Sequence, residues 1–411
     1  MTNRDTPRLN RSLSLPLVSL YGLGNILGAG IYVLIGKVSG EAGYLAPYAF
    51  LLASAVAAIS AFSYAELASR YPLSAGEAVY VQKGLNIKQL SLVVGLLIIA
   101  TGIVSAATIA RGFVGYLQVF VDLPAWVTII TLLTLLGVIA IWGITQSVAT
   151  AAVFTLLEVG GLLLILWIAY PALEEFPRRA QEAAQGSGRM GWIGLVSGAY
   201  LAFYAYVGFE DIVNVAEEVK RPRRVLPMAI LIALGGATLF YCLVAVSALA
   251  VLSPDELGSS DAPLAAVYQQ VTGANPWIIS IISMIAVVNG ALIQIIMASR
   301  VGYGLARQGW LPQVLASVHP ATRTPMLATV LITIMIIIAA LWLPITTLAN
   351  ATTTLLLLIF SLVNLSLIRV KLRIGAGSDV FNVPLLVPVL GMITTLLFLA
   401  AQATAIVLGT A

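Results

Sequence analysis

Long apolar segments separated by short polar stretches run along almost the whole chain. The first covers residues 13–38, behind a polar and basic start, and it is too long for the apolar region of a signal peptide. Ten more follow it, at 44–69, 90–120, 124–143, 148–171, 192–215, 227–252, 276–305, 325–343, 346–368 and 384–409. Because about 20 apolar residues cross a bilayer as a helix, the pattern predicts an all-α polytopic membrane protein with eleven spans.

The composition supports this prediction and excludes the soluble classes of protein. Of the 411 residues, 60% are hydrophobic and only 9% are charged, whereas a soluble domain carries about 25% charged residues. The single cysteine, Cys242, excludes an internal disulfide, and the single histidine, His319, excludes a multi-histidine metal site. We therefore expect neither a metal nor a cofactor.

The basic residues predict the orientation in the membrane. With the N-terminus inside, sixteen of the 21 lysines and arginines fall on the inner side, and the outer half holds Lys37, Arg111, Arg178, Arg179 and Arg189. Because cytoplasmic loops collect Lys and Arg, we expect a plasma (inner) membrane protein with a cytoplasmic N-terminus and an outer C-terminus. The net charge of +4 reflects this topology, so nucleic acid is not expected as a partner.

Two of the spans are predicted to be interrupted helices. Span 1 contains the glycine-rich sequence YGLGNILGAGIYVLIG, and span 6 has Gly208 just ahead of two acidic residues. Glycine frees the backbone to leave the helix, and freed backbone groups inside a membrane are tolerated where they line a cavity. The alternative is close helix packing through small residues. Paired interruptions five spans apart are typical of an inverted-repeat transporter with a site near the membrane midplane.

The interruptions also predict how the chain is organised. We expect one transmembrane transporter domain over 1–411 with a five-plus-five inverted-repeat fold. Spans 1–5 (about 13–171) form the first repeat, spans 6–10 (about 192–368) form the inverted second repeat, and an eleventh span follows at about 384–409.

Four sequence motifs resemble one family of transporters, the amino acid–polyamine–organocation permeases. They are Gly28-Ala29-Gly30-Ile31-Tyr32 in span 1, Tyr64-Ala65-Glu66-Leu67 at the end of span 2, the stretch from Phe203 to Pro227 and the stretch from Asn289 to Pro312. The resemblance extends over nearly the whole chain and implies the five-plus-five fold with spans 1 and 6 unwound at the substrate site. The chain departs from many members in having eleven spans instead of twelve, and Glu158 where they carry Lys.

The interrupted helices suit the head of an amino acid, which carries a carboxylate and an ammonium group. The amide groups at the start of a half-helix bind anions, and free carbonyls at the end of one accept hydrogen bonds from ammonium. Gly28 and Gly208 let the substrate approach the backbone closely. The expected carboxylate donors are Ala29, Gly30 and Ile31, and the expected ammonium acceptors are Ile26, Leu27, Phe203, Tyr204 and Tyr206.

Spans 3 and 8 are expected to contribute the pocket for the substrate side chain. The candidates are Ser105, Ala106 and Asn289, with Tyr204, Tyr206 and Phe209 as aromatic walls or gates. The alternative for the aromatic residues is ordinary helix packing, and Asn289 could instead bridge two helices by a hydrogen bond.

A few ionisable residues inside the spans are candidates for coupling or gating. Glu158 lies in the middle of span 5, where a charge is costly, so it is a candidate proton carrier or a structural protonated glutamate. Arg111 is a candidate for snorkelling, a structural pair or an outer gate. Glu210 and Asp211 follow the interruption of span 6 and are expected to line the inner vestibule, with the alternative that Asp211 ties the half-helix to a neighbour.

The charged residues of the inner loops suggest two simpler roles. Glu66 and Arg70 are expected to form an interfacial or gating ion pair. The run Glu217, Glu218, Lys220 and Arg221 is expected to be a solvated loop.

These observations predict a secondary active amino acid transporter that works by alternating access. The chain has no Walker A sequence, so ATP is not the expected energy source. Proton-coupled uptake of neutral amino acids is the preferred mode, with the proton as coupling ion, and an exchanger or a carrier of cationic amino acids or polyamines is the alternative. An intramembrane enzyme is disfavoured because no catalytic constellation is found, and a sensor because no soluble domain is appended.

Overall fold

The computed structural model describes residues 11–407 apart from 75, 119, 122, 143, 261, 343–344, 376 and 378. This described part is helical throughout, and its one β pairing is an isolated parallel bridge between Leu13 and Val219. The predicted all-α fold class is therefore confirmed.

Ten of the eleven predicted spans each coincide with one helix of the structure, and span 6 (192–215) covers the last part of a long helix, a turn and most of a 3-10 helix. The long helices are α1 (Leu15–Ala42), α2 (Ala46–Arg70), α4 (Lys88–Gln118), α5 (Ala125–Trp142), α6 (Ile144–Ala169), α7 (Phe176–Ala205), α8 (Pro222–Val251), α11 (Trp277–Arg307), α12 (Met326–Trp342), α13 (Ile345–Ile374) and α14 (Leu386–Val407). Short helices connect them: α3 (Gly76–Leu85), α9 (Pro254–Ser259), α10 (Pro263–Thr272) and the 3-10 helices η1 (Gly43–Leu45), η2 (Tyr170–Glu175), η3 (Glu210–Glu218) and η4 (Gln313–Ala316).

The connection between α8 and α11, at 253–275, is largely helical. It contains α9 and α10, and α9 begins with a capping box in which Ser253 and Glu256 bond to each other's backbone amides. Such reciprocal bonds satisfy amide groups that a short helix leaves free, which is why a polar segment without apolar periodicity still forms a helix here.

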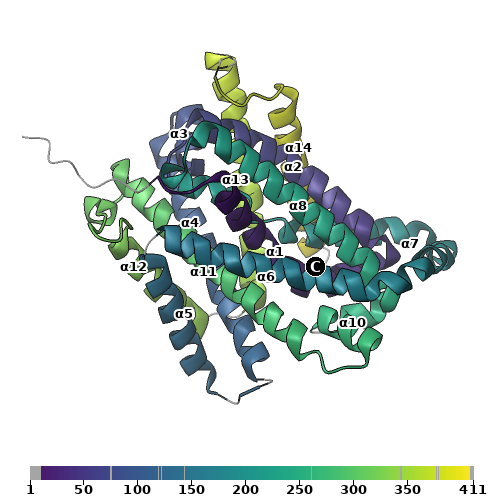
Figure 1. The fold of residues 1–411 in the computed structure, drawn as a ribbon. Helices are drawn as coiled ribbons and strands as arrows, with labels where there is room; N and C mark the ends of the chain where they lie inside the picture. Colours follow the sequence, from purple (N-terminus) through teal and green to yellow (C-terminus); the bar gives the residue numbers. More distant parts are fainter. Residues whose placement is uncertain are drawn as a thin grey trace, which may run out of the picture.

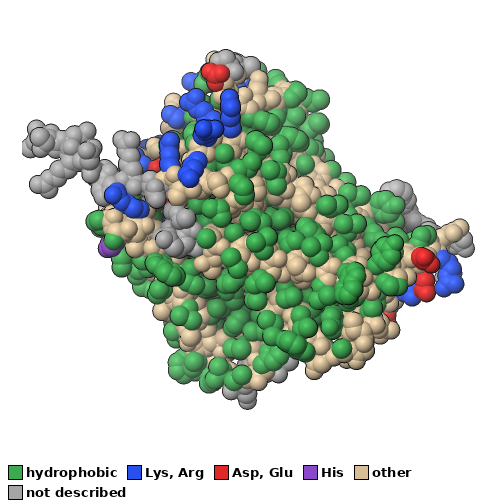
Figure 2. Space-filling model, in the orientation of Figure 1, with side chains coloured by type: hydrophobic (Ala, Val, Ile, Leu, Met, Phe, Trp, Pro, Cys, Tyr) green, Lys and Arg blue, Asp and Glu red, His purple; other side chains and the backbone are tan. Residues whose placement is uncertain are grey.

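The distribution of apolar helices defines a multi-pass membrane protein. Within the described residues, seven helices are long and apolar enough to cross a membrane, and three shorter apolar helices accompany them. Figure 2 shows hydrophobic side chains over the broad middle of the molecule, while Lys and Arg gather mainly at its upper end. An apolar belt with basic residues concentrated at one end is the surface expected of a protein embedded in a bilayer.

Helix α1 lies near the centre of the bundle (Figure 1), where it packs against α6, α7, α8 and α11. Helix α11 also packs against α4, α2 packs against α8, and α13 packs against α14 and α3. Because other helices surround the middle of α1, a polar group in that part of the helix meets protein.

Both predicted interruptions are present. Helix α1 has a non-helical residue at Gly28, with φ −20° and ψ −105°. Helix α7 ends at Ala205, a turn follows, and the chain resumes as η3 at Glu210. The division of the spans into two inverted repeats stays a prediction.

Candidate functional site

The two interruptions lie against each other. Gly208 has φ +128°, a backbone conformation that residues with a side chain rarely adopt. A Cβ atom added to it would lie 2.7 Å from Nδ2 of Asn25. The same Asn25 amide donates a hydrogen bond of 3.0 Å to the Gly208 carbonyl. Glycine at position 208 therefore allows the turn after α7 to pack directly on α1.

A buried polar cluster joins these interruptions to α11. The carboxylate of Asp211 accepts hydrogen bonds from Asn25 Nδ2 and, at 2.8 Å, from Gln294 Nε2. Gln294 also donates to Asn25 Oδ1 at 3.3 Å. Asp211 thus ties η3 to both neighbouring helices, as one of its two predicted roles required.

Glu210, the other acidic residue after the turn, closes a local loop. Its Oε2 atom accepts a hydrogen bond of 2.8 Å from the Gly208 amide, two residues earlier in the chain. The carboxylates of Glu210 and Asp211 are almost fully buried. Water therefore does not compete for their hydrogen bonds, which fix the geometry of the turn.

A narrow pocket lies beside this cluster, between α4, the turn after α7, η3, α11 and α13. Its lining consists of Ile98, Thr101, Ser105, Tyr204, Val207, Glu210, Asp211, Gln294, Met297 and Leu356. The space inside is ≈ 20 Å³, which is room for about one water molecule. The predicted residues Ser105, Tyr204, Glu210 and Asp211 are thus brought together around a pocket that is closed in this conformation.

Asn289, predicted for this pocket, belongs to a second polar cluster around Glu158. Its Nδ2 atom donates to Glu158 Oε1 at 2.7 Å and to Thr155 Oγ1 at 3.1 Å. Tyr32 donates from its hydroxyl to the Glu158 carbonyl at 2.6 Å. Asn289 therefore bridges α11 and α6 by hydrogen bonds, which was the alternative to a pocket position.

Helix α1 passes directly over this second cluster. A Cβ atom added to Gly24 would lie 1.9 Å from Thr155 Oγ1 and 2.5 Å from Asn289 Nδ2, and Thr155 donates a hydrogen bond of 3.1 Å to the Leu20 carbonyl. Glu158 itself is fully buried, and its Oε2 atom has no hydrogen-bond partner in the described part of the chain. Movement of α1 would therefore change the surroundings of the Glu158 carboxyl group.

The hydroxyl group of Tyr241 in α8 lies within hydrogen-bond distance of a backbone carbonyl at each interruption. Its hydroxyl lies 2.5 Å from the Ile26 carbonyl and 2.8 Å from the Ala205 carbonyl. The carbonyls of Phe203 and Tyr204 accept hydrogen bonds from the amides of the turn itself, at 3.0 and 3.2 Å. In this conformation the predicted ammonium acceptors Ile26, Phe203 and Tyr204 are thus engaged within the protein.

The aromatic residues of span 6 form a packed cluster with α2, α8 and α13. The ring of Phe209 lies 5.6 Å from that of Tyr64 and 5.4 Å from that of Phe360, and the ring of Tyr206 lies 5.0 Å from that of Tyr241. Such ring distances are typical of aromatic pairs in protein interiors. Phe209 and Tyr206 therefore fill the space behind the turn.

The remaining predicted residues fall into three groups. Leu27, Ile31 and Ala106 are buried, and Gly28 faces the backbone of α11 at Gly290. Ala29 and Gly30 lie in α1, outside the residues whose side chains the structure describes. Arg111 donates from Nε to the Ala340 carbonyl at 2.6 Å and from Nη2 to the Leu341 carbonyl at 3.3 Å, so it caps the C-terminal end of α12.

The end of the molecule that carries η3 and the C-terminal part of α11 is held by ion pairs. Glu218 is fully buried and pairs with Arg300 at 3.0 Å, and Glu217 pairs with Arg307 at 2.6 Å. The prediction of a solvated loop at 217–221 is therefore wrong for Glu218, because η3 carries it inward onto α11. Glu66 pairs with Arg70 at 2.7 Å, as predicted, and also with Lys371 at 2.8 Å.

Five residues of these clusters were not predicted as site residues: Asn25, Tyr32, Thr155, Tyr241 and Gln294. Gln294 and Thr155 are single polar residues in apolar segments, and each lies within five residues of a predicted site residue. Polar residues in spans usually face the protein interior, so this spacing was an available signal. Tyr241 gave no comparable signal, because a tyrosine in a span also suits the membrane interface.

An apolar helical bundle in which two interrupted helices meet at a buried polar cluster has the architecture of a membrane transporter. The sequence profile of the Amino acid permease family matches residues 13–409. The chain belongs to this family of amino acid transporters, and the family is not enzymatic.

Named relatives span several substrates and membranes. The chain is 28% identical to the branched-chain amino acid permease BcaP of Bacillus subtilis, over 78% of this chain and 72% of the relative. It is 29% identical to the mitochondrial cationic amino acid transporter 3 of Arabidopsis thaliana, over 90% of this chain and 64% of the relative. An uncharacterized transporter of Mycobacterium tuberculosis is 32% identical, with 78% and 72% covered.

Proposed function

We propose that the chain is a secondary transporter that takes up neutral amino acids together with protons by alternating access. The observation that carries this proposal is the contact between the two interrupted helices, where Asn25 of α1 bonds to the Gly208 carbonyl. An amino acid head is zwitterionic, and half-helix ends offer it partial charges without charged side chains. The backbone amides of Ala29, Gly30 and Ile31 in α1 would bind the carboxylate.

The hydrogen bonds of Tyr241 support a site that opens by exchange of partners. Its hydroxyl spans the carbonyls of Ile26 and Ala205, which are the groups that a substrate ammonium would need. Withdrawal of this hydroxyl would free acceptors on both interrupted helices at once. Binding of the substrate and release of Tyr241 are therefore coupled steps in the proposed cycle.

The pocket favours a neutral side chain. Five of its lining residues, Ile98, Val207, Met297, Leu356 and the ring of Tyr204, are apolar or largely so. The carboxylate of Asp211 is engaged by two amide donors and that of Glu210 by the Gly208 amide. An aliphatic side chain would thus meet apolar groups, in keeping with the name of the Bacillus relative.

We assign the proton to Glu158. This carboxyl group is fully buried, it forms no ion pair with a described residue, and one of its oxygens lacks a partner. A buried carboxyl group without a cation is far less costly when it is protonated. Exposure to the outer solution and then to the cytoplasm, as α1 moves, would load and release the proton.

A cationic substrate is the second candidate, and one observation favours it. Two acidic side chains, Glu210 and Asp211, border the pocket, and they would balance the charge of a lysine, an arginine or a polyamine. The printed name of the Arabidopsis relative refers to cationic amino acids. Exchange of one amino acid for another is the corresponding alternative to proton coupling.

Uptake into proteoliposomes tests both candidates. The purified chain is reconstituted, and each of the common amino acids and putrescine is offered with and without an inward proton gradient. We expect neutral aliphatic amino acids to accumulate and the gradient to raise their initial rate. Uptake restricted to cationic substrates, or uptake that requires internal amino acid and ignores the gradient, would replace the proposal by its alternative.

The proposed location is the plasma membrane with a cytoplasmic N-terminus. The basic end of the molecule (Figure 2) and the excess of inner-side lysines and arginines support this orientation. Accessibility of an N-terminal epitope in right-side-out and inverted vesicles measures it directly.

A further inference from the structure

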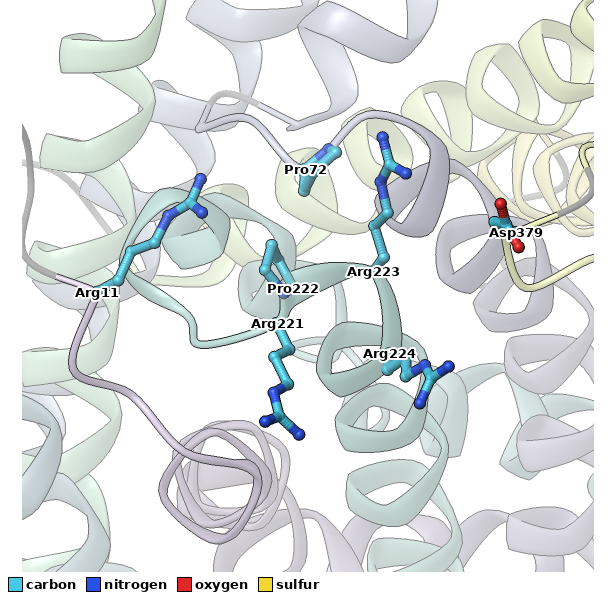
Figure 3. A pocket seen from close by; sticks show the side chains of 7 residues that line it. All are labelled: Arg11, Pro72, Arg221, Pro222, Arg223, Arg224 and Asp379. Carbon is cyan, nitrogen blue, oxygen red and sulfur yellow. The ribbon is translucent and has the colours of Figure 1, made fainter.

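A separate pocket lies at the basic end of the molecule, away from the interrupted helices. Its volume is ≈ 610 Å³, and its lining consists of Arg11, Pro72, Arg221, Pro222, Arg223, Arg224 and Asp379 (Figure 3). Four segments that are far apart in the sequence thus contribute to one hollow. They are the stretch before α1, the turn between α2 and α3, the start of α8, and the loop between α13 and α14.

The arginines of this pocket are free of carboxylate partners. All four are exposed, and none of their guanidinium groups forms an ion pair or a hydrogen bond with a described residue. Three other arginines at this end are paired: Arg70 with Glu66, Arg300 with Glu218 and Arg307 with Glu217. Four positive charges and the single carboxylate of Asp379 leave the pocket strongly cationic, and the start of α8 adds its positive dipole end.

The pocket continues into an apolar groove. The adjoining hollow has a volume of ≈ 560 Å³ and shares three lining residues with the first, Arg223, Arg224 and Asp379. Its other lining residues are Pro227, Met228, Leu231, Val380 and Phe381. Met228 is half-exposed and lies on α8, one of the helices apolar enough to span a membrane, so this groove faces lipid.

We propose that the two hollows form one binding site for an anionic glycerophospholipid of the inner leaflet. The phosphate group lies among the arginines, and an acyl chain follows the groove along α8. Arginine is well suited to phosphate because its planar guanidinium group binds two oxygens at once, and basic pockets at the cytoplasmic ends of spans bind anionic headgroups. The combination of unpaired arginines and an apolar extension distinguishes this site from a binding site for free phosphate.

The arrangement in Figure 3 fits a headgroup at the membrane surface. Arg11 and Arg223 flank Pro222 and extend upward in this view, whereas Arg221 extends downward and Arg224 extends to the right. The guanidinium groups therefore border the hollow instead of converging on one point. A phospholipid headgroup with several polar oxygens can contact such a border, while a compact anion would reach only part of it.

Occupancy of this site would hold the inner face in its present conformation. Arg11 stands two residues before Leu13, whose backbone bonds to Glu218 and Lys220 at 3.1 and 2.8 Å. Glu218 is in turn fixed by Arg300 of α11. A lipid that bridges Arg11 to Arg223 therefore clamps the segment before α1 against the start of α8, next to the buried ion pair.

Lipid retention in native mass spectrometry tests the proposal. The full chain is purified in mild detergent and offered phosphatidylglycerol or phosphatidylcholine with the same acyl chains. The test variant replaces Arg11, Arg223 and Arg224 by Gln. A matched control replaces Arg323, Arg369 and Arg373 by Gln, because these arginines are also exposed at this end and lie outside both hollows. A third variant replaces the three test arginines by Lys.

We expect phosphatidylglycerol to bind at least about tenfold more tightly than phosphatidylcholine. The test variant should lose that preference, and the control and the Lys variant should keep most of it. Glycerol phosphate at equal concentration should compete at least tenfold less well than the intact lipid. Equal losses in the test and control variants, equal binding of the two lipids, or full competition by glycerol phosphate would overturn the proposal. Elution of each variant as a single monodisperse peak in size-exclusion chromatography confirms that it is folded.

Discussion

At the residue scale, single glycines decide where the helices of the site can meet. Gly208 combines a positive φ with close contact to Asn25, and Gly24 leaves room for Thr155 and Asn289. In contrast, Gly235 of α8 has no neighbouring atom within 4 Å of the position of an added Cβ. The glycines of the chain therefore differ sharply in what a methyl group would disturb.

Replacement of Gly208 by alanine tests this contrast. The change forces a rare backbone conformation, at a cost of about 1–3 kcal/mol, and pushes Cβ onto Asn25. We expect Gly208→Ala to lower the uptake rate by about tenfold or more, whereas Gly235→Ala should retain the wild-type rate and gain slightly in helix stability. Normal uptake by Gly208→Ala would show that the two interruptions need not touch.

Replacement of Glu158 by glutamine tests the proton assignment. Glutamine keeps the hydrogen-bonding side chain but cannot release a proton. Glu158→Gln should abolish stimulation of uptake by the proton gradient and should leave exchange between internal and external amino acid within about threefold of wild type. Thr155→Val removes a hydrogen bond from the same cluster without changing a titratable group, and it should keep its response to the gradient. A gradient response in Glu158→Gln would assign the proton elsewhere.

At the element scale, the sequence predicted the helices well because apolar length is a local property. Ten of the eleven predicted spans coincide with helices, span 6 covers the end of α7, a turn and most of η3, and the interruptions at Gly28 and Gly208 follow from local glycine content. The partners of the polar side chains depend on which helices pack together. Asn289 was therefore predicted for the pocket, although it bonds to Glu158, and Glu218 was predicted in solvent, although η3 buries it against α11.

The buried pair between η3 and α11 gives a prediction at this scale. Loss of one partner leaves an uncompensated buried charge, so Arg300→Met should lower the free energy of unfolding by about 3 kcal/mol in mixed micelles. The double variant Glu218→Gln with Arg300→Met should recover at least half of that loss. Arg307→Gln breaks a more exposed pair with Glu217 and should cost about 1 kcal/mol or less. Equal losses in both single variants would argue against a special role of the buried pair.

At the scale of the whole molecule, the structure represents a closed state of the transporter. The pocket has room for about one water molecule, and ion pairs join η3 to α11 and α2 to α13. The sequence predicted a multi-pass membrane protein because apolar composition is a property of the whole chain, and the orientation inferred from its basic residues stays a prediction. The sequence did not predict which conformation is stable, because that depends on side-chain contacts between distant segments.

The pH dependence of stability provides a test at this scale. Glu77 lies on the connecting helix α3, and burial raises the pKa of its side chain to about 8. The folded state thus holds a proton that the unfolded state releases near pH 4.3, so the stabilisation is full below that pH and is lost as the pH rises through about 8. We expect the unfolding free energy in micelles to fall between pH 5 and pH 9 by at least about 1.4 kcal/mol, the equivalent of one pKa unit.

The variant Glu77→Gln separates this contribution from the rest of the protein. Its side chain stays neutral at every pH, so the decline should be markedly smaller in this variant. Glu174→Gln, a replacement of an exposed residue, should keep the wild-type slope. An unchanged slope in Glu77→Gln would assign the pH dependence to other groups.

A transported amino acid is proposed to bind between the interrupted helices and α4. Protection of a cysteine at position 105 from labelling tests this binding site. Because Cys242 is the single cysteine of the chain, Ser105→Cys in a Cys242→Ser background carries one reactive thiol at the pocket. We predict that a saturating transported amino acid slows labelling by maleimide at least about threefold. An amino acid that is not transported should leave the labelling rate of Ser105→Cys unchanged. Both amino acids should leave the labelling rate of Ser259→Cys unchanged, because this position of α9 is exposed. Labelling of Ser105→Cys at the same rate with and without the transported amino acid would contradict the account.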